Sequence, residues 1–434
     1  MEISLIGVVF GLAVAVIMIT MKVSAVISLF FGAVIGALVG GASIGYTLQN
    51  VIIWGGASVM GVNVRIIVAG VLAGVLIESG AAEVIARTIV DKLGAKRAVL
   101  SMALSCMILT GVGIFNTISI VMLSPLALSV GEKTKISKIS MLLALSGGSK
   151  AGNIISPNPN AVAVSEGFGL SLSEVMIGGI IPGLIALIAT VAIASRGKLM
   201  RKGPMVAEHE VAKVEDGKDS GLPSFIKAVS GPAIAVGLLI ISPIGNVLGI
   251  EVLRAFQIDA FFILPFAGVM GALIMGKRKQ LISYINAGVM RMMPVTLLLT
   301  GAGAIGGLIQ FSVVPAMLAD GIIAAGLPGF ILAPVSSALM AAATGSAVTG
   351  AILATNAFAE TLMVSFGVTA LSAGVMLHAG CMFIDVMPHG NIFLASRESM
   401  KMEVKERMVL VPLEAAIGGI MVVATTILYG FIWT

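Results

Sequence analysis

Charged residues are scarce in this sequence, because Asp, Glu, Lys and Arg together make up 11% of its 434 residues. Hydrophobic residues make up 58%, and the mean hydropathy is +1.11. The chain therefore has too few polar side chains to cover a soluble globule of this size. This scarcity excludes a soluble globular domain and predicts an integral membrane protein.

Cysteine and histidine are also rare, with 2 and 3 residues. Cys106 and Cys381 both lie in apolar runs, which favours small buried side chains over a disulfide or a metal pair. The three histidines do not recur with acids or cysteines at ligand spacing, so we expect no metal site and no cofactor. An intramembrane hydrolase is disfavoured as well, because no Ser, His and acid cluster sits on paired spans.

Long apolar runs are what the sequence has in abundance. Several reach the roughly 20 residues that a helix needs to cross about 30 Å of hydrocarbon. Glu2 stands where a signal peptide would carry positive charge, so we expect the first run to be retained. Spans are predicted near residues 3–21, 23–41, 65–80, 136–154, 173–195, 225–247, 256–276, 283–310, 367–386 and 409–432.

Two further apolar runs do not fit single spans. The run from 98 to 130 would extend about 50 Å as one helix. It carries the small and polar residues GVGIFNT (111–117) at its centre, and the run at 328–364 carries ATGSAVTG (343–350). Irregular backbone survives at membrane depth only where it is buried in protein or lines a wet cavity. Both runs are therefore interpreted as re-entrant hairpins, with an ordinary pair of short spans as the alternative.

The distribution of basic residues gives the two halves opposite orientations. Lysine and arginine flank the first hairpin and fill the polar loop at 196–202, which places both on the cytoplasmic side. Between Met292 and Ser396 there is neither Lys nor Arg, which places the second hairpin on the outer side. The net charge of +5 follows from these loops, and no patch of basic and aromatic residues suggests nucleic acid.

The spacing of the polar breaks also repeats. Glu78 to Asn116 spans 38 positions, and Gln310 to Ser346 spans 36. The intervals that follow are also similar, with 44 positions from Asn116 to Asn160 and 45 from Ser346 to Asn391. The sequence therefore predicts an all-α polytopic membrane protein with an inverted repeat of five transmembrane helices plus one re-entrant hairpin per half, and broken helices at the midplane. The first repeat is residues 1–195 (hairpin 98–130, broken helix 136–169), the cytoplasmic linker is 196–223, and the second repeat is 224–434 (hairpin 328–364, broken helix 367–396).

These breaks are the predicted binding site of the protein. Prolines at 157, 159 and 388 free backbone groups within the bilayer, and helix N-termini that converge on one cavity would attract an anion. The candidate substrate-binding residues are the polar ones at the breaks: Asn116, Thr117, Lys150, Ser156, Asn158, Asn160, Ser346, Thr349, His389 and Asn391.

Three of the charged candidates have competing interpretations. Lys150 needs a counter-ion, either a substrate carboxylate or a nearby acid, unless it reaches the interface. Glu78 and Asp385 are the candidate proton carriers, because desolvation raises the pKa of a carboxyl group toward the pH at which the protein works. Glu78 equally fits a helix cap near Ser79.

Four segments resemble the gluconate permease family of proton symporters, within the ion transporter superfamily. They are VLAGVLIESGAAEVIARTIVDKLGAKRA (71–98), GIFNTISIVMLSPLAL (113–128) at the first hairpin tip, GSAVTGAI (345–352) and NIFLASRESMKM (391–402). Asn116-Thr117 followed by SPNPNAVA (156–163) is also similar to the sodium symporters of that superfamily. The resemblance implies a homodimer with a scaffold part and a mobile part, which moves a hydroxy acid with protons by an elevator mechanism.

The functional prediction is a multi-pass transporter of a bacterial inner membrane, a symporter of gluconate or a related small organic anion. The coupling ion is expected to be the proton, and possible partners besides the substrate are the lipid bilayer and a second copy of the chain. Sodium-coupled carboxylate symport and sodium/proton antiport are the alternatives within transport. A channel suits the two opposed tips less well than alternating access does.

Overall fold

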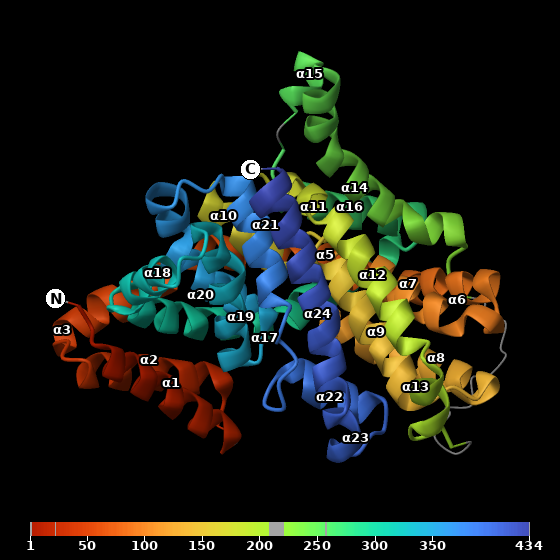
Figure 1. The fold of residues 1–434 in the computed structure, drawn as a ribbon. Coiled ribbons are helices and arrows are strands. Elements are labelled where there is room, and N and C mark those ends of the chain that lie inside the picture. Colours follow the sequence, from red (N-terminus) through yellow and green to blue (C-terminus); the bar gives the residue numbers. More distant parts are fainter. Residues whose placement is uncertain (1, 22, 208–220, 257, 434) are drawn as a thin grey trace.

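The computed structural model describes residues 2–21, 23–207, 221–256 and 258–433 (Figure 1). Over these residues the chain is helical, and its one β-bridge joins Ile3 to Ser312. The all-α prediction is therefore confirmed. The predicted linker at 196–223 falls partly outside the described residues, and its described beginning forms α13 (Gly197–Lys202).

Each of the ten predicted spans contains a helix. In chain order these are α1 (Leu5–Thr20), α2 (Ala25–Val39), α5 (Met60–Glu78), α9 (Lys138–Asn153), α12 (Ile180–Ala194), α14 (Phe225–Leu248), α16 (Ala260–Ile274), α17 (Leu281–Gln310), α21 (Ala370–Cys381) and α24 (Leu410–Ile427).

The lengths of these helices differ from the prediction. Among the described residues, five helical stretches are long and apolar enough to cross a membrane, or up to seven if each of two bent pairs is one span. One bent pair, at 104°, joins α6 (Ala81–Leu93) to α7 (Ala98–Gly111), and the other, at 113°, joins α10 (Pro159–Phe168) to α11 (Leu172–Gly178). Helices such as α2, with 15 residues, extend only about 22 Å. The apolar run that predicts such a span therefore continues into non-helical residues at its ends.

Both predicted hairpins consist of two helices with a short interruption between them. The first is α7 followed by α8 (Asn116–Thr134), and the second is α19 (Leu332–Thr344) followed by α20 (Ala347–Glu360). The two predicted broken helices are also interrupted, since α9 is followed by α10 and α21 is followed by α22 (Asn391–Ser399). The two halves of the chain thus share one order of elements, and their opposite orientation in the membrane stays a prediction.

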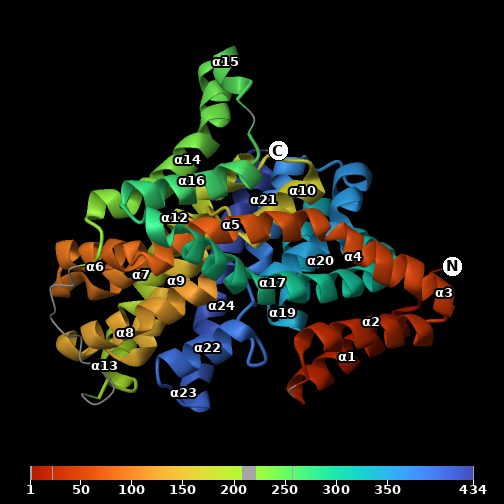
Figure 2. The same cartoon turned by 180° about the vertical axis from the view of Figure 1, so that it is seen from behind.

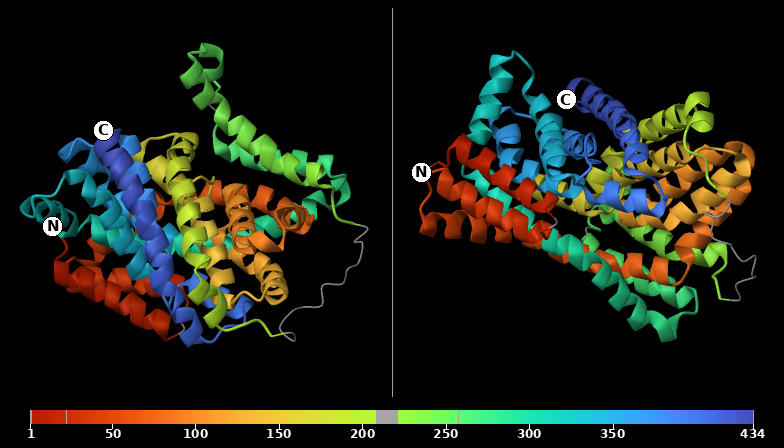
Figure 3. Two further views of the ribbon diagram at one scale, coloured as in Figure 1. Left: turned by 45° about the vertical axis from the view of Figure 1, so that its right-hand side comes forward. Right: turned by 90° about the horizontal axis from the view of Figure 1, so that it is seen from below.

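Helix contacts divide the molecule into two groups. In the first group α1 packs on α2, and α17 packs on α2 and α5, with α14 and α16 alongside (Figure 2). The second group contains both hairpins and both broken helices, with α12 and α24 lying side by side across them (Figure 3). Each half of the chain contributes equivalent elements to each group. The groups meet where α20 packs on α17 and α10 packs on α5.

Candidate functional site

The tip of the first hairpin is a turn between α7 and α8. Gly113 has φ of +99°, a left-handed conformation that a residue with a Cβ atom adopts at a cost. α8 then begins at Asn116 without a side-chain cap from Phe115. Asn116 is 6% exposed, and its Oδ1 accepts from the Thr117 amide at 2.9 Å. The sequence folds the polar residues of this tip into a helix N-terminus, where the Asn116 side chain occupies the amide of Thr117.

The tip of the second hairpin has the same construction. Gly345 ends α19 in the left-handed region, with φ of +63°. Ser346 caps α20, because its Oγ accepts from the amide of Thr349 at 3.3 Å and from the hydroxyl of the same residue at 3.2 Å. A Cβ atom on Gly345 would lie 2.9 Å from the His389 ring, so this tip touches the break between α21 and α22. Glycine is required here for both conformation and space.

The tips of both hairpins and one break line a single cavity of about 520 Å³. Six predicted binding residues contribute to its wall: Asn116, Thr117, Ser346, Thr349, His389 and Asn391. The Oγ1 atom of Thr117 and the Nε2 atom of His389 have no hydrogen-bond partner among the described residues. α22 starts at Asn391 after Gly390, which gives its first amides no side-chain cap. Three helix N-termini therefore meet at one cavity, and unpaired polar atoms accompany them.

The break of the first half does not line this cavity. Asn158 caps α10 through its Oδ1, which accepts from two backbone amides at 2.8 and 3.0 Å. Its Nδ2 donates to the backbone and side chain of Asn153, and Asn160 also donates to the Asn153 side chain. Ser156 is buried, and its hydroxyl is unpaired among the described residues, as is Oδ1 of Asn160. These polar residues mainly satisfy their own interrupted helix.

Lys150 and Asp385 form an ion pair between the two halves of the chain. Both side chains are buried, at 4% and 2% exposure. Lys150 Nζ also donates to the carbonyl of Met382 at 2.5 Å, at the C-terminus of α21. Of the two predicted counter-ions, the structure thus gives this lysine a nearby acid, and neither partner lines the cavity.

A second buried ion pair was not predicted from the sequence. Arg407 and Glu414 are fully buried and joined by two hydrogen bonds, of 2.8 and 3.0 Å. Ser396 of α22 accepts from Arg407 at 2.9 Å, and Ser146 of α9 donates to Glu414. The sequence does contain a signal for this pair, because Glu414 is the one acid in the last apolar run and follows Arg407 by seven residues. The pair holds α9, α22 and α24 together.

Glu78 lies away from both the cavity and the buried pairs. It is the last residue of α5, and its side chain, 31% exposed, pairs with Arg291 of α17 at 2.5 Å. This contact lies within the first group of helices. The structure therefore gives Glu78 a partially exposed arginine partner at a helix end.

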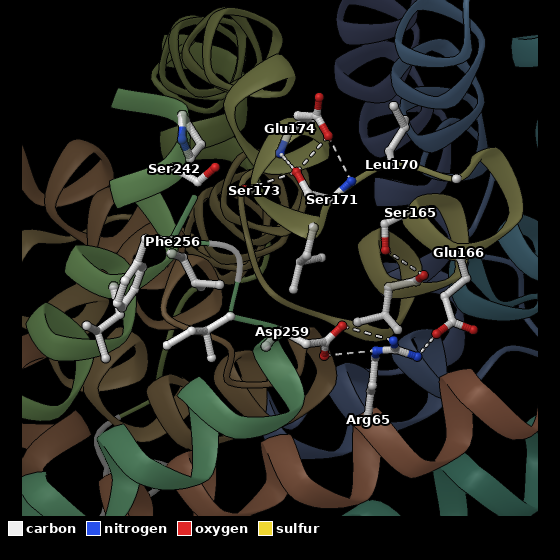
Figure 4. A pocket seen from close by; sticks show the side chains of 18 residues that line it. Arg65, Ser165, Glu166, Leu170, Ser171, Ser173, Glu174, Ser242, Phe256 and Asp259 are labelled. Carbon is white, nitrogen blue, oxygen red and sulfur yellow. Dashed lines mark hydrogen bonds and ion pairs between the residues drawn. The ribbon is translucent and has the colours of Figure 1, made fainter. Parts of the chain in front are cut away.

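A second pocket, of about 650 Å³, lies where the two groups meet (Figure 4). Arg65 of α5 binds Asp259 through two hydrogen bonds, of 3.1 and 2.9 Å, and also pairs with Glu166 of α10. Asp259 caps α16 by accepting from the Phe261 amide at 2.7 Å. The three charged side chains point toward one another, so they bridge α5, α10 and α16.

The chain is similar to known transporters over most of its length. A model of a family described as GntP family permease matches residues 3–432. An uncharacterized transporter of Haemophilus influenzae is 42% identical over 428 residues, which cover 99% of this chain and 98% of that protein. A high-affinity gluconate transporter of Escherichia coli is 23% identical over 370 residues, 81% of this chain and 80% of its own. The D-serine transporter DsdX of Escherichia coli O6:H1 is 26% identical over 227 residues, which cover 51% and 48%.

A solved structure is similar in fold. The YdaH transporter of Alcanivorax borkumensis, described as having an unusual topology, superposes with a TM-score of 0.62 at 16% identity. The match covers 89% of this chain and 88% of that one.

Proposed function

Because the chain belongs to the GntP family of permeases, we propose that it is a secondary active transporter of a small organic anion, gluconate or a related hydroxy acid, in symport with protons. Members of this family are transporters and not enzymes, and the apolar helices fit a multi-pass membrane protein. The names of two relatives, a gluconate transporter and a D-serine transporter, support a small carboxylate as the transported solute.

The observation that carries this proposal is the convergence of the two hairpin tips and the second break on one cavity. Asn116, Ser346 and Asn391 each stand at a helix N-terminus there. Such ends carry about half an elementary positive charge, and their free amides point at a bound anion. Two opposed hairpins that stop at one cavity also suit a site reached alternately from either side.

Asp385 is the proton carrier in this proposal. In the ion pair with Lys150 the two buried charges cancel each other. Protonation of Asp385 leaves the lysine charge uncompensated in a low-dielectric interior, which favours an anion nearby. Proton binding and anion binding thereby support each other, as symport requires. Asp385 lies in the break between α21 and α22, and His389 and Asn391 at this break line the cavity, whereas Glu78 ends α5 and pairs with a partially exposed arginine.

The transport cycle would follow from the two groups of helices. The first group, with α5 and α17, serves as the scaffold, and the second group carries the cavity between the membrane faces in an elevator motion. Scaffold contacts between two copies would form a homodimer in a bacterial inner membrane. No cofactor and no nucleic acid take part.

Uptake into proteoliposomes tests the proposal. Purified full-length protein is reconstituted, and uptake of labelled gluconate and a panel of hydroxy acids is measured with an imposed pH gradient or with a sodium gradient. Gradient-dependent uptake of one of these acids, kept in the exposed variant Glu83→Gln, is the expected result. Because Asp385→Asn mimics the protonated acid, we expect this variant to lose gradient-driven uptake but still to bind the acid in detergent, and loss of both would indicate unfolding and not a lost proton carrier. No uptake across the panel contradicts the anion proposal, and uptake driven by sodium alone replaces proton coupling with sodium coupling.

A further inference from the structure

The cavity has a polar wall made by the second group of helices. Asn116 is 6% exposed, and the hydrogen bond of its side chain within the described residues is the one that Oδ1 accepts, which leaves Nδ2 without a partner there. Thr117 is 9% exposed, with its hydroxyl unpaired. These buried polar groups lie at the N-terminus of a helix of 19 residues, beside those of α20 and α22. Unpaired buried donors at such a place indicate a ligand with a carboxylate.

Charged side chains do not line this cavity in the described part of the chain. Lys22 belongs to the residues that the structure does not describe. Peptide dipoles stabilise one carboxylate, because each helix end supplies only a partial charge. A second carboxylate would find no cation among the described lining residues, and an ammonium group would find no anion. The lining therefore favours a monoanion over a dicarboxylate or an amino acid.

The first group of helices supplies an apolar wall. Among the described residues that α1, α2, α17 and the α1–α2 connection contribute, Ser24 is polar and the others are apolar: Ile19, Val23, Ala25, Val26, Leu29, Pro294, Val295, Leu297, Leu298 and Leu299. A hydroxyl placed against such a wall loses its water partners, which weakens binding on the order of tenfold to a hundredfold for each hydroxyl left unpaired. A methyl or ethyl group there gains from burial.

From these three features we infer that the transported solute is a short monocarboxylate whose carboxyl end is polar and whose far end is apolar, such as a 2-hydroxy acid with an alkyl tail. This inference rests on the proposed function and narrows its substrate class. The carboxylate and the adjacent hydroxyl lie against the polar wall at Asn116 and Thr117, and the alkyl tail lies against the wall formed by α2 and α17.

Three four-carbon acids that each depart from 2-hydroxybutyrate in one kind of group test this inference: 2-aminobutyrate has an amino group in place of the hydroxyl, malate a carboxylate in place of the methyl group, and threonate two additional hydroxyls. The dissociation constants of 2-hydroxybutyrate, 2-aminobutyrate, malate and threonate are measured by calorimetry on the detergent-purified full chain, with gluconate as a fifth ligand. We expect 2-hydroxybutyrate to bind at least tenfold more tightly than each of the others. Binding of malate, threonate, 2-aminobutyrate or gluconate within threefold of 2-hydroxybutyrate overturns the inference and leaves anion transport standing. Binding of none of the five, together with no uptake, overturns the proposed function itself.

A pair of threonine variants shows whether binding occurs at this cavity. Thr117→Val removes an unpaired hydroxyl from the polar wall, and Thr355→Val removes an equally buried unpaired hydroxyl on α20 that does not line the cavity. Both changes keep the shape of the side chain. We expect the first to weaken 2-hydroxybutyrate binding about tenfold and the second to leave it unchanged. Equal affinity in the two variants contradicts the assignment of the site.

Discussion

The ion pair of Lys150 and Asp385 gives a sharp prediction about stability. In Asp385→Asn, the lysine keeps the Met382 carbonyl at 2.5 Å but loses its counter-charge, at a site where it is only 4% exposed. Removing one partner of a buried pair costs about 3–5 kcal/mol, because the other charge is left uncompensated. That is a large part of a total of about 5–15 kcal/mol for a typical protein. The variant is therefore expected to be severely destabilised.

The double variant Lys150→Met/Asp385→Leu separates charge from packing. Replacing a buried pair by apolar residues is often neutral or stabilising, so the double variant is expected to be more stable than either single variant. Equilibrium unfolding in mixed micelles, followed by circular dichroism, measures the free energy of unfolding of the parent, of the single variants Asp385→Asn, Lys150→Met and Asp385→Leu, and of the double variant. The exposed pair of Glu83 and Arg87 on α6 is the control, with an expected loss of about 0.3–0.5 kcal/mol in Glu83→Gln. Single variants as stable as that control, or a double variant less stable than both, would refute this reasoning.

Three further predictions concern packing and hydrogen bonds. Gly345→Ala is expected to lower the free energy of unfolding more than Gly367→Ala, because both glycines have φ near +64° but only the first would place a Cβ atom against neighbouring atoms; equal losses would contradict the close contact. Ser146→Ala is expected to cost about 1.5–3 kcal/mol by removing a donor from buried Glu414, whereas Ser101→Ala, which loses only a bond to its own helix, is expected to stay within about 1 kcal/mol of the parent. The two cysteines are both fully buried, so maleimide labelling of the folded protein is expected to be slow and to follow unfolding; rapid labelling in native micelles would show that α7 or α21 is open.

The sequence predicted the breaks because their chemistry is local. Gly113 and Gly345, each close to Asn, Ser or Thr in an otherwise apolar run, identify positions where an uninterrupted helix is unfavourable. The same signal predicts that Asn116 and Ser346 bind one substrate, and the structure places both residues at one cavity. Patterns of this kind involve residues that are adjacent in the sequence, so they can be recognised without the structure.

Partners that come from distant parts of the chain were harder to predict. Lys150 and Asp385 are 235 positions apart, and their pairing follows from how α9 packs beside the end of α21. The apolar wall was also missed, since Val26 and Leu298 look like ordinary span residues in the sequence. The lengths of α1 and α2 were overestimated because hydropathy continues past the last helical residue. These features depend on tertiary contacts that no single run of residues contains.

The absence of charged side chains from the described cavity lining bears on the energetics of the transport cycle. The two buried pairs, Lys150 with Asp385 and Arg407 with Glu414, sum to zero charge, and peptide dipoles add none. In the proposed elevator cycle, an empty carrier would move these two pairs across the bilayer without net charge, and a carrier that also holds one proton and one monoanion would do the same. A membrane voltage of 100 mV does about 2.3 kcal/mol of work on one elementary charge, and neither form presents one. With that stoichiometry the turnover rate is expected to stay constant when valinomycin and potassium set the voltage.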